Sequence, residues 1–188
     1  MRIATMTMTA VLILAASAQG KSENKREVTV YYTDNASVPY LTRVQAQGLA
    51  STMFAGIGVT LNWRHGAPSH AEPGAIAIDF VTHTPETLMP GALAYALPYE
   101  GVHIRIFWDR IGSDRTGPEL LAHVMVHEIT HILQGVVQHS SEGIMKARWT
   151  PQDRSSLARK PLHFTEFDVV LIHNGLDARG ATVEIASK

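Results

Sequence analysis

The chain of 188 residues contains no cysteine, and this absence removes several classes of protein. Without thiols there is no disulfide-stapled fold, zinc ribbon, iron–sulfur cluster or cysteine nucleophile. An excess of one charge is also lacking, because 16 basic and 17 acidic residues leave a formal net charge of -1. Nucleic acids and anionic membranes are bound by clustered excess Lys and Arg, so neither partner is expected. Any bound metal ion must therefore take nitrogen and oxygen ligands.

Long hydrophobic runs are lacking as well, and the longest one lies at the N-terminus. Arg2 precedes an apolar run from Ile3 to Ala15, interrupted by threonines, and Ala16-Ser-Ala18 follows. The run is too short and too interrupted to span a membrane as a helix. Together, the basic residue, the apolar run and the small residues form the three regions of a secretory signal peptide. We predict a signal peptide over residues 1–18 and a single domain over residues 19–188 that is secreted or periplasmic. The alternative is an uncleaved amphipathic anchor.

Hydrophobic periodicity predicts alternating strands and helices in the first half and mostly helices later. Strands are expected over residues 27–32, 59–63, 75–81, 92–97 and 102–108. Helices are expected over residues 39–56, 117–134 and 165–175, the last of them ending near Gly175, with an irregular stretch before it. The segment 75–81 is nearly continuously apolar, which is typical of a strand covered on both faces. This order predicts an α+β fold with one twisted mixed sheet.

The helix expected over residues 117–134 carries the sequence His127-Glu-Ile-Thr-His131. Residues four apart lie about 40° apart around an α-helix and about 6 Å along it, so both imidazoles can reach one metal ion. Glu128 lies about 100° around the helix from His127 and need not bind the ion. Its carboxylate is placed to act as the general base for a metal-activated water. The pattern therefore indicates hydrolysis, and a peptide bond is the expected substrate.

A catalytic zinc requires a third protein ligand and one open position. His139 is the candidate, because Gly135 can adopt a positive φ and turn the chain back toward the two helix histidines. Three carboxylates remain alternatives: Glu142, Asp153 and, on the following helix, Glu166. His123 lies about 12 Å along the helix from His131, too far to share an ion, and is expected to pack or to form a supporting hydrogen bond.

The segment from His127 through Gly135 and His139 to Met145 resembles the metzincin clan of zinc endopeptidases. The clan signature is HExxHxxGxxH, followed by a turn whose methionine lies beneath the metal. Here Gly135 comes one residue late and His139 two residues late, so the motif is expanded. The resemblance implies His127, His131 and His139 as zinc ligands, Glu128 as catalytic residue and Met145 as the methionine beneath the metal. It also implies a zincin-like fold with an active-site helix and a C-terminal helix.

Upstream, Gly91-Ala-Leu-Ala-Tyr-Ala-Leu-Pro98 and Val102-His-Ile-Arg-Ile-Phe-Trp-Asp109 resemble the matrixins, a family within that clan. In matrixins the first segment is the antiparallel edge strand of the sheet, and extended substrate pairs with it. The resemblance implies that a peptide or protein substrate binds along Ala92 to Tyr95. Matrixins also hold a structural zinc in this region. His83 and His103 match two of its ligands, but Tyr95 stands in place of a third, so we predict one zinc ion.

The sequence thus predicts a secreted, monomeric zinc-dependent endopeptidase, with Tyr95 or Tyr99 as candidates for polarising the scissile carbonyl. A non-catalytic exported module that binds zinc on a zincin scaffold is the alternative. His139 and Glu166 both stay open as the third ligand.

Overall fold

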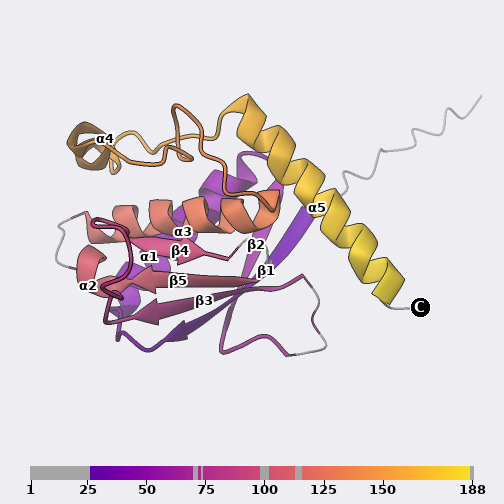
Figure 1. Cartoon of the computed structure of the whole chain (residues 1–188), viewed down its shortest axis with the longest axis horizontal. Coiled ribbons are helices and arrows are strands. Elements are labelled where there is room, and N and C mark those ends of the chain that lie inside the picture. The colour runs from indigo at the N-terminus through magenta and orange to yellow at the C-terminus, as the bar shows by residue number, and fades with distance from the viewer. Residues whose placement is uncertain (1–25, 70–71, 73, 98–101, 113–115, 187–188) are drawn as a thin grey trace, which may run out of the picture.

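The computed structural model describes residues 26–69, 72, 74–97, 102–112 and 116–186. The predicted signal peptide and its cleavage site at Ala18 lie outside the described residues. Within the described part, none of the helices has the length and apolar character needed to cross a membrane. Figure 1 shows the arrangement: a sheet on one side of the molecule, helices packed along it, and a long C-terminal helix that extends past the sheet.

The sheet has five strands and is mixed, as the sequence predicts. Its strands are β1 (Arg26–Asp34), β2 (Val59–His65), β3 (Ile76–Val81), β4 (Ala94–Ala96) and β5 (His103–Phe107). They lie in the order β2-β1-β3-β5-β4. The first four in this order are parallel to their neighbours, and β4 pairs antiparallel with β5 at the edge. The edge strand predicted around Ala92 to Tyr95 is therefore present, displaced toward the C-terminus to Ala94–Ala96.

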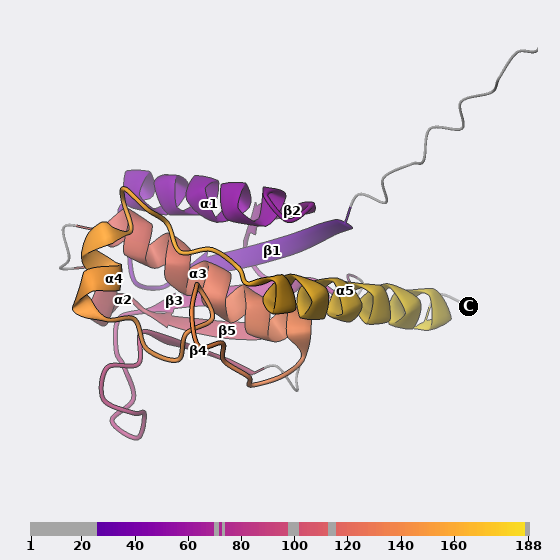
Figure 2. The same cartoon turned by 90° about the horizontal axis from the view of Figure 1, so that it is seen from above.

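Two helices cover one face of this sheet, α1 (Tyr40–Ala55) and α3 (Gly117–Gln134). They pack against each other, and Figure 2 shows them side by side over the strands. Burial along β3 alternates, with Ile76, Ile78 and Phe80 fully buried and the residues between them half-buried. The expectation that this strand is covered on both faces was wrong, because the helices lie on one face only. The apolar residues of the other face are small or, like Val81, only partly covered.

The C-terminal helix α5 (Glu166–Ala186) continues well past the end predicted near Gly175. Gly175 does not terminate the helix. It lies where α5 crosses the end of α3, and a Cβ atom there would overlap the carbonyl oxygen of Leu133. Glycine permits this close approach of two backbones because it has no side chain. Gly175, which in the sequence resembles the end of a helix, therefore permits the close contact between α5 and α3.

Two short helices complete the fold, α2 (Trp108–Ile111) directly after β5 and α4 (Pro151–Ser156). The second lies in the stretch predicted to be irregular. It begins with a capping box, in which the Thr150 hydroxyl accepts from the Asp153 backbone N–H and the Asp153 carboxylate accepts from the Thr150 N–H. Local hydrogen bonds of this kind stabilise a helix too short to show hydrophobic periodicity.

Candidate metal centre

Helix α3 carries His127 and His131 on the side that faces a cavity. Each ring is oriented by a backbone carbonyl: His127 Nδ1 lies 2.9 Å from the Ile144 oxygen, and His131 Nδ1 lies 3.1 Å from the Val136 oxygen. A carbonyl can only accept, so in both rings Nδ1–H is the donor. The proton of each neutral ring is thereby placed on Nδ1, which leaves Nε2 with its lone pair.

The two Nε2 atoms face each other at 3.1 Å. Two lone pairs cannot hydrogen-bond to each other, so this approach is favourable only with a cation between them. Two nitrogens bound to one tetrahedral zinc at about 2.0–2.1 Å are about 3.3 Å apart, close to the spacing seen here. Burial and the neighbouring His131 lower the pKa of His127 to about 3, and burial also lowers the pKa of His131. Both rings are therefore neutral and available as ligands at neutral pH.

His139 completes a group of three histidines. Gly135 ends α3 in the left-handed conformation, with φ 67°, as the sequence predicts, and the chain returns toward the helix. The His139 ring stacks on His127 at 5.3 Å between centroids and meets His131 edge-on at 4.9 Å. One ligand nitrogen from each of the three residues lies within 4.8 Å of the others. In the described part of the chain no other group of His, Asp or Glu has this geometry, so Glu142, Asp153 and Glu166 stand outside the cluster.

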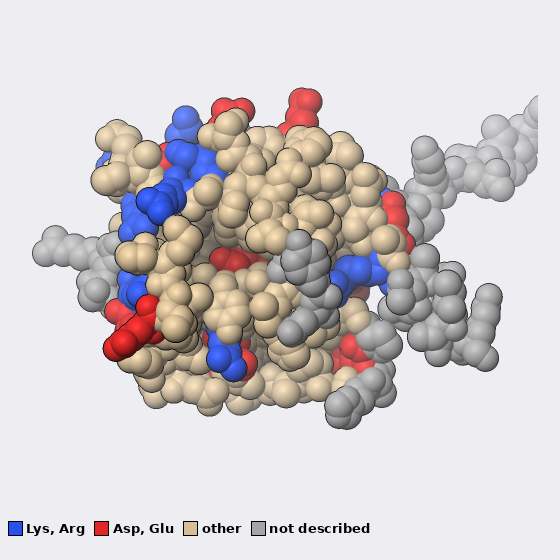
Figure 3. Space-filling view, in the orientation of Figure 1, with Lys and Arg blue, Asp and Glu red and all other residues tan. Residues whose placement is uncertain are grey.

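Glu128 lies on the same helix and borders the same cavity, which has a volume of about 490 Å³. The residue is 8% exposed, and its carboxylate accepts a hydrogen bond from the Ala96 N–H of β4. Burial raises the pKa of Glu128 to about 8, although the Ala96 amide opposes the shift. Figure 3 shows the hollow in this face of the molecule, with acidic atoms at its bottom. A carboxylate with a raised pKa beside a ligand cluster is suited to hold or transfer a proton near neutral pH.

The orientation of His127 depends on a second layer of residues that the sequence motif does not contain. The Ile144 carbonyl accepts from His127 and also from the indole N–H of Trp149, at 3.2 Å. The Trp149 ring meets His127 edge-on at 5.8 Å and His123 at 6.1 Å. Partners of this kind hold a ligating histidine in one orientation and one tautomer.

His123 is fully buried and has the supporting role expected from its position on the helix. Its Nδ1 donates to the Glu119 carbonyl at 2.7 Å, and its Nε2 accepts from the Leu162 N–H at 3.0 Å. Both ring nitrogens are therefore occupied, so His123 binds α3 to the segment before α5 and offers no ligand atom. Met145 is also fully buried, directly after Ile144, and its carbonyl accepts from the Ser140 N–H at 2.8 Å.

Asp168 supports the site although sequence reasoning did not select it. Asp168 is 2% exposed, and its carboxylate accepts from the Ser140 hydroxyl at 2.6 Å, next to His139. It also accepts from the Thr165 N–H at 2.8 Å, and the Thr165 hydroxyl accepts from the Asp168 N–H. Thr165-x-x-Asp168 is thus a capping box, a signal visible in the sequence. The carboxylate of α5 that reaches the site is Asp168, through the loop that carries His139, whereas Glu166 is exposed.

The other candidates of the sequence stand apart from this cluster. His103 is opposite Ala77 at the start of β3, whereas His83 follows the opposite end of that strand. The register therefore separates the two histidines by the length of β3. Tyr95 lines the cavity and packs on Phe107 at 6.0 Å, and Tyr99 is outside the described residues.

These features define a class of fold, which is zincin-like. The five-stranded sheet is mixed, and its antiparallel edge strand borders a helix with two histidines four residues apart. No protein-family model matches the chain, and no curated protein matches it. Among solved structures the chain is similar to the archaemetzincin (amzA) of Methanopyrus kandleri. The TM-score is 0.55 at 13% sequence identity, over 84% of this chain and 98% of that chain. The predicted fold class is therefore confirmed. Three histidines of the chain, His127, His131 and His139, could hold a metal ion.

Proposed function

We propose that the protein is an exported zinc-dependent endopeptidase. The observation that carries the proposal is the pair of His127 and His131 Nε2 atoms, which face each other at 3.1 Å while both Nδ1 atoms donate to carbonyls. With His139 they supply three neutral imidazoles and leave a fourth position open to the cavity, which is the ligand set of a catalytic zinc. In this proposal Met145 lies beneath the metal as a packing residue.

Zinc bound at this site would lower the pKa of a water molecule and polarise a peptide carbonyl. Glu128 would take the proton of the attacking water and return it to the leaving amine. Burial raises the pKa of Glu128 to about 8, and the positive charge of a zinc ion beside the carboxylate would lower it again, toward the range in which a base takes up and releases a proton near neutral pH. The Ala96 N–H holds the carboxylate in position between proton transfers.

The substrate would bind in an extended conformation along β4. Leu97 N–H donates to His103 and Phe107 N–H donates to Leu93, so the odd-numbered residues of this segment face β5. By the alternation of an antiparallel pair, the backbone groups of Ala94 and Ala96 point to the open edge. The Ala96 N–H is used by Glu128, and the remaining groups can pair with a peptide strand. The edge therefore directs a peptide backbone past the general base.

The proposal also includes cleavage of the signal peptide after Ala18, export, and a monomeric mature domain of residues 19–188. N-terminal sequencing of the exported protein tests the first two statements, with Gln19 expected at the new N-terminus. Sedimentation of the purified protein tests the third.

The central test compares Glu128→Gln with Glu86→Gln, in which an exposed carboxylate outside the cavity is changed in the same way. Purified protein should contain one zinc per chain and cleave a mixed peptide library. Glu128→Gln should retain zinc and lose roughly a hundredfold or more in kcat/KM, because general-base catalysis contributes factors of about 10²–10⁴. Glu86→Gln should match the wild type. Zinc binding without turnover in the wild type would instead establish the non-catalytic binding module.

The third ligand is tested separately with His139→Ala and Glu166→Ala. Only loss of a true ligand should weaken zinc affinity strongly, so His139→Ala is expected to reduce it and Glu166→Ala is not. The reverse result would replace His139 with the carboxylate alternative.

A further inference from the structure

One wall of the cavity is built from basic side chains. Lys146, Arg148 and Arg154 line it, whereas Glu128 is the one acidic residue among its described lining. Figure 3 shows Lys and Arg side chains gathered on the side of this face where α4 lies. The net charge of the whole chain is -1, so this concentration of positive charge is local.

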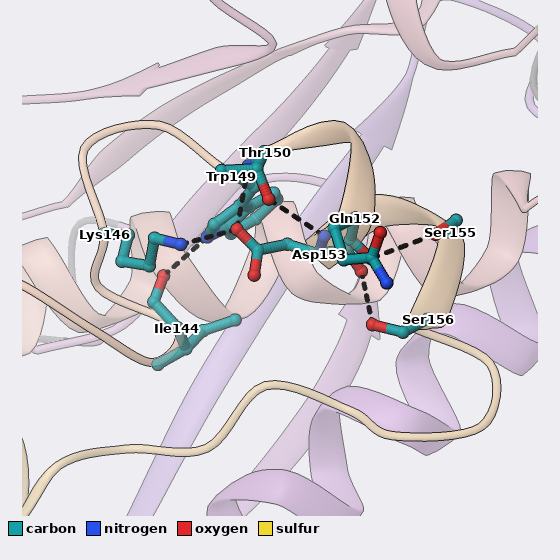
Figure 4. A network of polar contacts seen from close by, with 8 residues as sticks. All are labelled: Ile144, Lys146, Trp149, Thr150, Gln152, Asp153, Ser155 and Ser156. Atoms are coloured by element: carbon teal, nitrogen blue, oxygen red, sulfur yellow. Dashed lines mark hydrogen bonds and ion pairs between the residues drawn. The ribbon is translucent and has the colours of Figure 1, made fainter.

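A network around Asp153 positions this wall (Figure 4). The Asp153 carboxylate accepts from the Lys146 ammonium at 2.5 Å and from the Thr150 N–H at 2.8 Å. The ion pair connects α4 with the loop that follows Met145, and it offsets the charge of Lys146. The pKa of Asp153 is lowered mainly by the Lys146 ammonium, so the carboxylate stays ionised. Two positive charges of the wall, those of Arg148 and Arg154, have no such partner among the residues that the structure describes.

The side chain of Arg154 has unused donors. It is half-buried, its Nε is enclosed with no hydrogen-bond partner, and it forms no ion pair within the described part of the chain. The exposed Arg148 side chain likewise has no acidic partner in that part. A guanidinium group that lines a cavity without an anionic partner can pair with an anionic group of a ligand, and hydrogen bonds between two charged groups are the stronger ones. Guanidinium groups match the two oxygens of a carboxylate in geometry and charge.

We propose that Arg154 and Arg148 form a specificity subsite that binds a carboxylate of the substrate within the active-site cavity. This rests on the proposed function, because the peptide backbone lies along β4 and the subsite borders the same cavity. The carboxylate is either an Asp or Glu side chain or the C-terminus of the peptide. Peptides with an acidic group at one fixed position relative to the scissile bond are therefore the preferred substrates.

The test uses zinc-loaded protein and peptides that differ only in Glu or Gln at each position around the cleavage site. At one position Glu should give about a tenfold higher kcat/KM than Gln, as expected for charge-assisted hydrogen bonds. The ratio should fall toward one in Arg154→Gln and further in the double variant with Arg148→Gln. Arg159→Gln is the matched control, because Arg159 is exposed and does not line the cavity; it should retain the ratio. A peptide ending at the preferred position, as free acid or as amide, distinguishes the C-terminal carboxylate from the side chain.

A binding measurement separates this inference from the proteolytic activity. Fluorescence anisotropy with labelled Glu and Gln peptides in a zinc-loaded Glu128→Gln background reports recognition without cleavage. The same preference for Glu, lost with Arg154→Gln and weakened by added salt, supports the subsite even if the wild type cleaves nothing. Cleavage with equal rates for Glu and Gln at every position would overturn the subsite and leave the endopeptidase intact. A preference that persists in the double variant, or no binding of either peptide, would also overturn it.

Discussion

Replacing Gly175 by alanine tests the crossing of α5 over α3. A Cβ atom at this position would overlap the Leu133 carbonyl oxygen and lie 2.8 Å from its carbonyl carbon. Both atoms belong to the backbone of a helix whose residue Leu133 is 1% exposed, so no flexible side chain can move aside. The helices must separate or α5 must bend. We expect the free energy of unfolding to fall by about 1–3 kcal/mol, the usual cost of overpacking, or more.

The matched control is Gly180→Ala on the same helix. A Cβ atom at Gly180 would have nothing within 4 Å, so only the helix propensity changes. Alanine in a helix interior is favoured over glycine by roughly 0.5–1 kcal/mol. The two variants should therefore differ by about 1.5–4 kcal/mol in urea denaturation, with opposite signs relative to the wild type. Zinc affinity should also fall in Gly175→Ala alone, because Leu133 is two residues after the ligand candidate His131.

Two results would refute this reasoning. Equal stabilisation by both substitutions would mean that the helices do not approach as closely as the structure shows. An unchanged stability in Gly180→Ala would mean that the helix ends near Gly175, as the sequence pattern predicts.

Three further predictions concern the metal centre and its support. Trp149→Phe keeps an aromatic ring but removes the N–H that donates to Ile144, so zinc affinity should fall about tenfold in a competition titration. Asp153→Asn removes the Lys146 ion pair and weakens the cap of α4. The free energy of unfolding, measured by urea denaturation at pH 7, should fall by about 1 kcal/mol. Because the folded-state pKa of Asp153 is lowered, its stabilisation is present above the unfolded-state pKa of about 4 and is lost as the pH falls through the folded-state pKa. Chelation of zinc should lower the melting temperature, since zinc at about 100 times its Kd stabilises by about 2.7 kcal/mol.

Each of these has a contrary outcome. Unchanged zinc affinity in Trp149→Phe would show that the Ile144 carbonyl orients His127 without help. A stability gap between wild type and Asp153→Asn that does not shrink as the pH falls below the unfolded-state pKa of Asp153 would assign the effect to packing rather than charge. A melting temperature that changes with neither chelator nor added zinc would show that the folded protein does not bind zinc.

Local patterns in the sequence predicted the strands, the three long helices and the helix position of the two histidines correctly, but not the short helices α2 and α4. His127, Glu128 and His131 lie on one helix, so their relative geometry follows from the pitch of α3 and needs no tertiary information. Gly135 was also predicted, because a residue with positive φ is a local requirement. The alternation of apolar residues similarly identified the strands, although the edge strand was displaced.

The tertiary structure decided what depends on residues far apart in the chain. The position of His139 depends on Ser140 bonding to Asp168, and the tautomer of His127 on the Ile144 carbonyl. The end of α5 was mispredicted because a glycine that stops a helix and one that admits a neighbouring backbone look the same in sequence. The absence of cysteine limited any metal site to nitrogen and oxygen ligands. Packing brought His139, the edge strand β4 and the basic wall around the cavity beside the helix histidines, because such contacts depend on the fold and not on spacing along the chain.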